Sequence, residues 1–171
     1  EELVEKKFGL LGEEKGQTRK SVYFAVTGRC NLQCEFCTMN SGPYVSTKND
    51  LNLEEIRNVL IPELLEVDQR KIVITGGEPL MRRDILEILD AFCHSFEKQR
   101  IVLQTNGLLL NADWVKKLAD KIGVLEISIE NIFDDLKLQK KMESVFEAAN
   151  EADVLLSLSF VVDQNSEKHL E

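Results

Sequence analysis

Apolar and polar residues follow two alternating patterns along the chain. Five short runs are rich in Val, Ile and Leu, and the stretches between them repeat apolar residues at helical spacing. Such alternation is typical of parallel strands joined by right-handed helical crossovers. We place the strands at approximately residues 21–26, 71–75, 101–105, 124–130 and 154–162. The pattern therefore predicts an α/β fold with a parallel sheet.

Four helices are predicted between these strands. The first begins after Asn52, an N-cap residue that forms a capping-box pattern with Glu55, and Pro62 is expected to kink or split it. The third begins near Asn111. Apolar residues of the other helices recur on one face, as Leu53, Ile56, Leu60 and Leu64, as Ile85, Leu89, Phe92, Cys93 and Phe96, and as Leu138, Met142, Val145, Phe146 and Ala149. Each of these faces is suited to packing against the sheet.

The fourth predicted strand separates apolar from polar side chains by parity. Leu125 and Ile127 alternate with Glu126, Ser128 and Glu130, so the two sets point to opposite faces. The same polar parity continues on the third and fifth strands, in Gln104, Asn106, Ser157 and Ser159. A half-solvated antiparallel sheet would give the same alternation, but the intervening helices favour a barrel-like sheet around a polar cavity.

Composition and charge narrow the class of protein. The chain has 171 residues, 43% of them hydrophobic, which is enough for one domain with a full core. No run approaches the roughly 18 consecutive apolar residues of a spanning helix, and the charged residues 1–20 contain no signal-peptide core. The net charge is −9, and no basic cluster could follow a phosphate backbone. We therefore expect a cytoplasmic protein whose main partner is neither a membrane nor a nucleic acid.

Three cysteines, Cys30, Cys34 and Cys37, lie in the segment after the first predicted strand. A loop at the carboxyl end of a parallel strand is the expected place for a functional site. Thiolates suit zinc or iron–sulfur clusters, and closed sites of either kind usually have four protein ligands, whereas this loop supplies three. The alternative is a zinc site completed elsewhere in the chain, by Cys93, His94 or His169. However, Cys93 lies on the apolar face of its helix and His94 on the polar face, so we predict a core cysteine and a solvated histidine.

The segment Thr75-Gly76-Gly77-Glu78-Pro79 follows the second predicted strand. Paired glycines let the backbone approach a neighbour closely and adopt unusual dihedral angles. Pro79 favours an extended conformation for Glu78, which would project the carboxylate from the strand end. On its own this segment could be an ordinary strand-to-helix turn.

Taken together, the two motifs resemble those of the radical S-adenosylmethionine (SAM, AdoMet) superfamily. The cysteines form that family's CxxxCxΦC loop, with Phe36 as the aromatic residue Φ, and Gly76 to Pro79 form its GGEP motif. The resemblance implies a partial (βα)6-type parallel barrel, of which about five βα units are present. It also implies a 4Fe-4S cluster held by the three cysteines, with SAM on the fourth iron. Reductive cleavage of SAM would then give a 5′-deoxyadenosyl radical that abstracts hydrogen from a substrate.

The resemblance also implies roles for single residues. Glu78 and the backbone of Gly76 and Gly77, with Pro79 beside them, would receive the ammonium group of SAM. Phe36 would border the adenine. Asn106 and Ser128 would be the polar positions that face the ribose and carboxylate of SAM. Val161 would provide the apolar contact on the fifth strand. The family's glycine-containing adenine motif is absent from that strand.

The resemblance divides the chain into a charged extension, residues 1–20, and a core domain, residues 21–171. Because the family's barrel has six strands, we expect the core to be truncated after its fifth. The long segment of residues 38–52 would either cover the cluster or form a solvated surface loop.

Three functions remain open at this level. The Cys-Asn-Leu-Gln-Cys and Gly-Gly-Glu-Pro-Leu-Met-Arg-Arg segments look most like those of peptide or protein maturases, which implies a peptide or protein substrate and a reductant such as flavodoxin or ferredoxin. The short chain also suits an activating enzyme that installs a glycyl radical on a partner protein. A non-catalytic zinc or iron–sulfur module, for partner binding or electron transfer, is the alternative from another class.

Overall fold

The computed structural model describes residues 20–67, 69–130, 132 and 135–162. It contains one sheet in which every neighbouring pair of strands is parallel and the spatial order follows the sequence. Its strands are β1 (Lys20–Ala25), β2 (Gln69–Thr75), β3 (Ile101–Thr105), β4 (Val124–Ser128) and β5 (Leu155–Ser159). The prediction of a parallel α/β fold is therefore confirmed. The predicted extension of residues 1–20 lies almost wholly outside the described residues.

The last two strands end earlier than predicted. β4 stops at Ser128 because the chain turns there, and the N–H of Ile132 donates to the carbonyl of Ile129 at 2.9 Å. β5 stops at Ser159, although the prediction continued the strand to residue 162. The apolar pattern alone could not locate these turns, because Ile129 and Val161 continue the strand-like composition.

The helical segments are α2 (Leu53–Glu55), η1 (Ile56–Leu60), α3 (Ile61–Leu65), η2 (Pro79–Met81), α4 (Ile85–Ser95), η3 (Lys98–Arg100), α5 (Ala112–Leu118) and α6 (Leu136–Glu151). The predicted capping box is present, with Glu55 N–H donating to Asn52 Oδ1 at 3.0 Å and Asn52 N–H donating to Glu55 Oε2 at 2.8 Å. Asn111 caps α5 as predicted. The irregularity expected at Pro62 takes the form of the π-helical turn η1 just before it, since Pro62 lacks the N–H of a regular turn.

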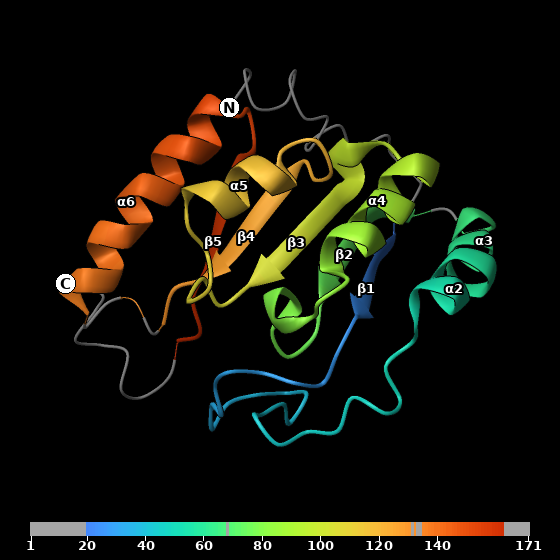
Figure 1. Cartoon of the computed structure of the whole chain (residues 1–171), viewed down its shortest axis with the longest axis horizontal. Helices are drawn as coiled ribbons and strands as arrows, with labels where there is room; N and C mark the ends of the chain where they lie inside the picture. Colours follow the sequence, from blue (N-terminus) through green and yellow to red (C-terminus); the bar gives the residue numbers. More distant parts are fainter. Residues whose placement is uncertain (1–19, 68, 131, 133–134, 163–171) are drawn as a thin grey trace.

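The larger helices α4, α5 and α6 cover one face of the sheet (Figure 1). On this face the strands present fully buried apolar side chains, among them Ile72, Ile74, Leu103, Leu125 and Ile127. The helices contribute Leu89, Phe92 and Val145 to the same core. Because all these side chains leave water together, the core fixes the positions of the strand ends that follow it.

The opposite face of the sheet changes from apolar to polar towards the carboxyl ends of the strands. Val73, Val102 and Val124 form a small buried cluster at its base. Two residues further along, Gln104 accepts a hydrogen bond from the Thr75 hydroxyl and donates one to Glu126, both at 2.7 Å. The polar parity seen in the sequence therefore lies on one inner face, as predicted. Among the described residues, no helix has both the length and the apolar character needed to cross a membrane.

Candidate metal centre and cofactor site

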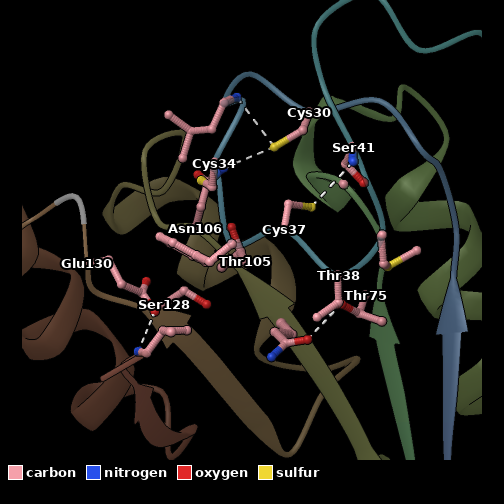
Figure 2. A pocket seen from close by; sticks show the side chains of 17 residues that line it. Cys30, Cys34, Cys37, Thr38, Ser41, Thr75, Thr105, Asn106, Ser128 and Glu130 are labelled. Carbon is pink, nitrogen blue, oxygen red and sulfur yellow. Dashed lines mark hydrogen bonds between the residues drawn. The ribbon is translucent and has the colours of Figure 1, made fainter. Parts of the chain in front are cut away.

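A cavity of about 260 Å³ opens at the carboxyl ends of the strands. One wall is the segment after β1, which contributes all three cysteines of the CxxxCxΦC motif. The other walls are residues 75–77 at the end of β2, residues 104–106 at the end of β3, and Ser128, Glu130 and Val161. Figure 2 shows the cysteines on one side of this cavity and Ser128 and Glu130 on the other. The cysteine segment and the strand ends thus form one site, where the βα loops of a parallel sheet are expected to meet.

The two glycines of the GGEP motif let the cysteine segment approach β2. Gly77 N–H donates to Thr27 O at 2.7 Å, and Glu78 N–H donates to Arg29 O at 2.8 Å. A Cβ atom on Gly77 would lie 2.2 Å from Arg29 O, and one on Gly76 would lie 2.4 Å from Thr27 O. Gly76 also has a φ of +142°, which L side chains rarely adopt. The glycines are therefore required for backbone packing inside the protein, whatever they contribute to a ligand.

Arg82 holds both ends of the cysteine segment, residues 26–51, a role that was not predicted from the sequence. Its guanidinium donates to Val26 O and to Leu51 O, both at 2.6 Å, and forms two hydrogen bonds with Asp84 at 2.8 and 3.0 Å. The two carbonyls lie 56 and 31 residues away in sequence. No local pattern reveals such distant backbone partners, although Arg82 stands within the Gly-Gly-Glu-Pro-Leu-Met-Arg-Arg segment.

Cys30 is buried and is approached by two donors. Leu32 N–H lies 3.4 Å from its Sγ, and the Asn106 amide nitrogen lies 3.7 Å away. Burial raises the pKa of the Cys30 thiol, and the hydrogen bonds from Leu32 and Asn106 oppose that shift. Because Asn106 also donates to Asn31 Oδ1 at 2.8 Å, the end of β3 is fastened to the cysteine segment.

Cys37 has the opposite tendency. Burial acts to raise the pKa of its thiol, but hydrogen bonds from the backbone of Ser41 and Met39, from the Ser41 side chain and from the Asn40 backbone together outweigh burial and lower the pKa below the usual value. The Ser41 N–H lies 3.3 Å from Cys37 Sγ. These donors favour the thiolate, which is the form that binds a metal.

The donor set is compatible with an iron–sulfur cluster. Three thiols line one cavity, and thiolates are the ligands that iron–sulfur clusters use. Across the described ranges, no three His, Cys, Asp or Glu side chains form a group that could hold a single metal ion. Three thiols would leave one iron of a four-iron cluster to another ligand.

The other candidate zinc ligands lie away from the cavity or outside the described residues. Cys93 is partly buried against the core on α4, as predicted, and burial raises the pKa of its thiol. His94 is exposed, as predicted, and its Nδ1 lies 2.6 Å from Asp90 O. His169 falls outside the described residues. The zinc alternative therefore loses Cys93 and His94 as fourth ligands.

Glu78 is completely buried, at 0% exposure. Its Oε1 accepts from Leu80 N–H at 2.9 Å and from the Thr105 hydroxyl at 2.8 Å, while Oε2 accepts from Asn106 N–H at 2.9 Å. The carboxylate is thus turned into the protein rather than projected from the strand end, because three internal donors compensate its burial. Its predicted contact with an ammonium group stays a prediction. Pro79 is also buried and does not line the cavity.

The remaining predicted cofactor residues all line the cavity, namely Phe36, Gly76, Gly77, Asn106, Ser128 and Val161. Ser128 Oγ lies 3.1 Å from Ser159 Oγ, and the Val161 N–H donates to Glu130 at 2.9 Å. Leu32 lines the cavity as well, although no role was predicted for it. Thr38 and Met39, which begin the segment of residues 38–52, also line the cavity.

The segment of residues 38–52 was predicted either to cover the cluster or to form a solvated surface loop, and its two parts differ in this respect. Thr38, Met39 and Ser41 line the cavity, so the first part borders the site. Tyr44 is 96% exposed, and residues 46–49 are exposed too. Only the beginning of this segment is therefore available to cover a cluster.

Comparison with known proteins agrees with this geometry. The family model of the radical SAM superfamily matches residues 24–152. A probable GTP 3′,8-cyclase of Methanopyrus kandleri is 35% identical over 128 residues, which are 74% of this chain and 39% of that protein. Molybdenum cofactor biosynthesis protein 1 of Drosophila melanogaster is 32% identical over 149 residues, which are 85% of this chain and 26% of that protein. The chain thus spans well under half the length of these curated relatives.

Among solved structures, native anSMEcpe with bound AdoMet and the Kp18Cys peptide superposes with a TM-score of 0.63. The sequences are 22% identical, and the match covers 88% of this chain and 45% of that one. A likeness at this level of identity concerns the fold, and it agrees with a partial parallel barrel. The family match extends over the cysteine segment, the GGEP motif and the polar strand ends. The chain therefore belongs to the radical SAM superfamily of enzymes.

Proposed function

We propose that this chain is the catalytic core of a radical SAM enzyme that modifies a peptide or protein. The observation that carries the proposal is the single cavity in which three thiols face the glycine pair and the polar ends of β3 and β4. Cys30, Cys34 and Cys37 would hold a 4Fe-4S cluster, which when reduced supplies the electron that cleaves SAM to methionine and a 5′-deoxyadenosyl radical. Flavodoxin or ferredoxin would be the reductant.

The protein's own contribution is to bind and orient SAM and substrate. The backbone of Gly76 and Gly77 offers polar groups to the amino-acid part of SAM, and Asn106 and Ser128 offer side-chain hydrogen bonds. Phe36 is 46% exposed and Val161 is 43% exposed, so both present apolar surface to the cavity. These two surfaces suit a planar base, because an aromatic or aliphatic side chain packs well against its face.

The charge of the cavity favours a peptide over a nucleoside triphosphate as the substrate. None of the described residues that line it is Lys, Arg or His, and Glu130 is among them. Glu126 lies on β4 and accepts a hydrogen bond from Gln104, which lines the cavity. Neither the Glu126 nor the Glu130 carboxylate forms an ion pair with a described residue. A polyanion is usually bound by basic side chains or helix N-termini. The relatives named as GTP 3′,8-cyclases make GTP the second candidate. An activating enzyme acting on a glycyl-radical protein falls within the protein-substrate class.

Anaerobic reconstitution with iron and sulfide tests the core of the proposal. We expect a brown protein with about four irons per chain, which forms 5′-deoxyadenosine from SAM when dithionite is added. Cys34→Ala should abolish product formation, measured by liquid chromatography with mass detection, whereas Cys93→Ala should retain it. A colourless protein that binds one zinc per chain would contradict the proposal.

The substrate class is tested with the same assay. A coupled substrate is expected to increase the rate of 5′-deoxyadenosine formation, so we would compare GTP with a set of short peptides that carry Lys or Arg and a matched set that carries Asp or Glu. The anionic cavity predicts stimulation by the basic peptides. Stimulation by GTP alone would instead favour the nucleotide candidate.

A further inference from the structure

The Ser41 side chain is buried at the wall of the cavity beside Cys37. Its exposure is 5%, and its hydroxyl makes no hydrogen bond of normal geometry within the described residues, although the side chain is close enough to lower the pKa of the Cys37 thiol. Burying a hydroxyl without a partner is costly, and such groups in native proteins usually indicate a missing ligand, ion or water. Ser41 lines the same cavity as the three cysteines.

The backbone on both sides of Ser41 holds the residue beside the thiols. Asn40 has a φ of +50° and turns the chain before Ser41. The Ser41 N–H lies 3.3 Å from Cys37 Sγ, and Figure 2 draws this hydrogen bond. On the other side, Cys30 N–H donates to Gly42 O at 3.1 Å. The Ser41 side chain therefore lies between the segments that carry Cys30 and Cys37.

We infer that the Ser41 hydroxyl donates a hydrogen bond to a sulfur atom of the bound cluster, either Cys37 Sγ or a cluster sulfide. The inference rests on the proposed function, because it requires the cluster. Hydrogen bonds to the sulfurs of a cluster stabilise its more negative, reduced state and so raise its reduction potential. Ser41 thus makes the cluster easier to reduce by the electron donor.

The test is the reduction potential of the reconstituted cluster, followed by electron paramagnetic resonance during an anaerobic redox titration without SAM. Ser41→Ala should shift the potential to a more negative value, and Ser41→Thr, which keeps the hydroxyl, should restore it. Ser46→Ala is the matched control. Ser46 lies in the same segment, is exposed, and its Oγ accepts from Lys48 N–H. Its substitution should leave the potential unchanged.

The reduction potentials and iron contents of the Ser41 variants show whether the hydroxyl bonds to the cluster. An unchanged potential in Ser41→Ala, or an equal shift in Ser41→Thr, would overturn the inference. If Ser41→Ala assembles no cluster, the iron content of Ser41→Thr decides: retention supports the hydroxyl bond, and equal loss overturns it. Failure of the wild-type protein to assemble a cluster would contradict the proposed function itself.

Discussion

Substituting Gly77 by Ala tests whether close backbone packing holds the cysteine segment in place. The added Cβ would lie 2.2 Å from Arg29 O and 2.9 Å from Gly28 O. Carbon–oxygen contacts are normally no shorter than about 3.3 Å, so the segment must move away by about 1 Å. That movement would break the hydrogen bonds from Gly77 to Thr27 and from Glu78 to Arg29, now 2.7 and 2.8 Å long.

The magnitude follows from these two bonds. Each backbone hydrogen bond contributes about 1 kcal/mol net, and a buried group left without its partner costs about 1–3 kcal/mol more. We therefore expect Gly77→Ala to lower the free energy of unfolding by about 2–4 kcal/mol. In a domain of this size that corresponds to a Tm lower by about 10 °C. Thermal unfolding followed by circular dichroism under anaerobic, reducing conditions measures it.

Gly42→Ala is the matched control in the same region. A Cβ on Gly42 would meet only Gln33 Cγ, at 3.9 Å, which is an ordinary contact. Its Tm should stay within a few degrees of the wild-type value, because Gly→Ala changes at compatible positions alter stability by less than about 1 kcal/mol. Equal Tm values for the two variants would refute the packing argument.

Two further predictions concern Arg82 and its partner. Arg82→Ala should destabilise the protein by about 3 kcal/mol and speed proteolysis of residues 38–52, because Val26 O and Leu51 O lose their charged donor. Arg83→Ala, at an exposed neighbouring position, should do neither. Hydrogen bonding and charge from Arg82 lower the pKa of Asp84. Its contribution to stability is therefore fully present above about pH 5 and lost as the pH falls below about 4. The unfolding free energies of wild type and Asp84→Asn should differ by about 0.5–1 kcal/mol at pH 7 and converge in acid. A difference that persists or grows in acid would contradict the assignment.

Local pattern was sufficient to predict most of the fold. Five strands, the capping box at Asn52 and Glu55, and the polar inner face all follow from periodicity and cap chemistry, which act between residues close in sequence. The cysteine segment and the glycine pair were recognisable for the same reason. Each is a contiguous motif whose chemistry is written in neighbouring residues.

The features that the sequence did not reveal depend on contacts between distant segments. Glu78 was expected to project towards a ligand, but hydrogen-bond donors hold its carboxylate inside the protein. One donor is the nearby Leu80 N–H, and the other two are Thr105 and Asn106, which lie 27 and 28 residues away in sequence. Arg82 reaches carbonyls on both sides of the cysteine segment. The burial of Ser41 beside Cys37 becomes visible only in the folded structure. Pairings of this kind are set by the tertiary structure and leave no periodic signal.

These distant contacts explain how three separate segments become one site. Glu78 binds Arg29 O through its backbone N–H and Asn106 through its carboxylate, and Asn106 in turn lies 3.7 Å from Cys30 Sγ. Protein contacts therefore bring the end of β3 beside this sulfur. A site arranged in advance loses less conformational entropy when its ligand binds. The buried carboxylate thus has a structural function consistent with its complete burial, because Glu78 holds the end of β3 beside the segment that carries the cysteines.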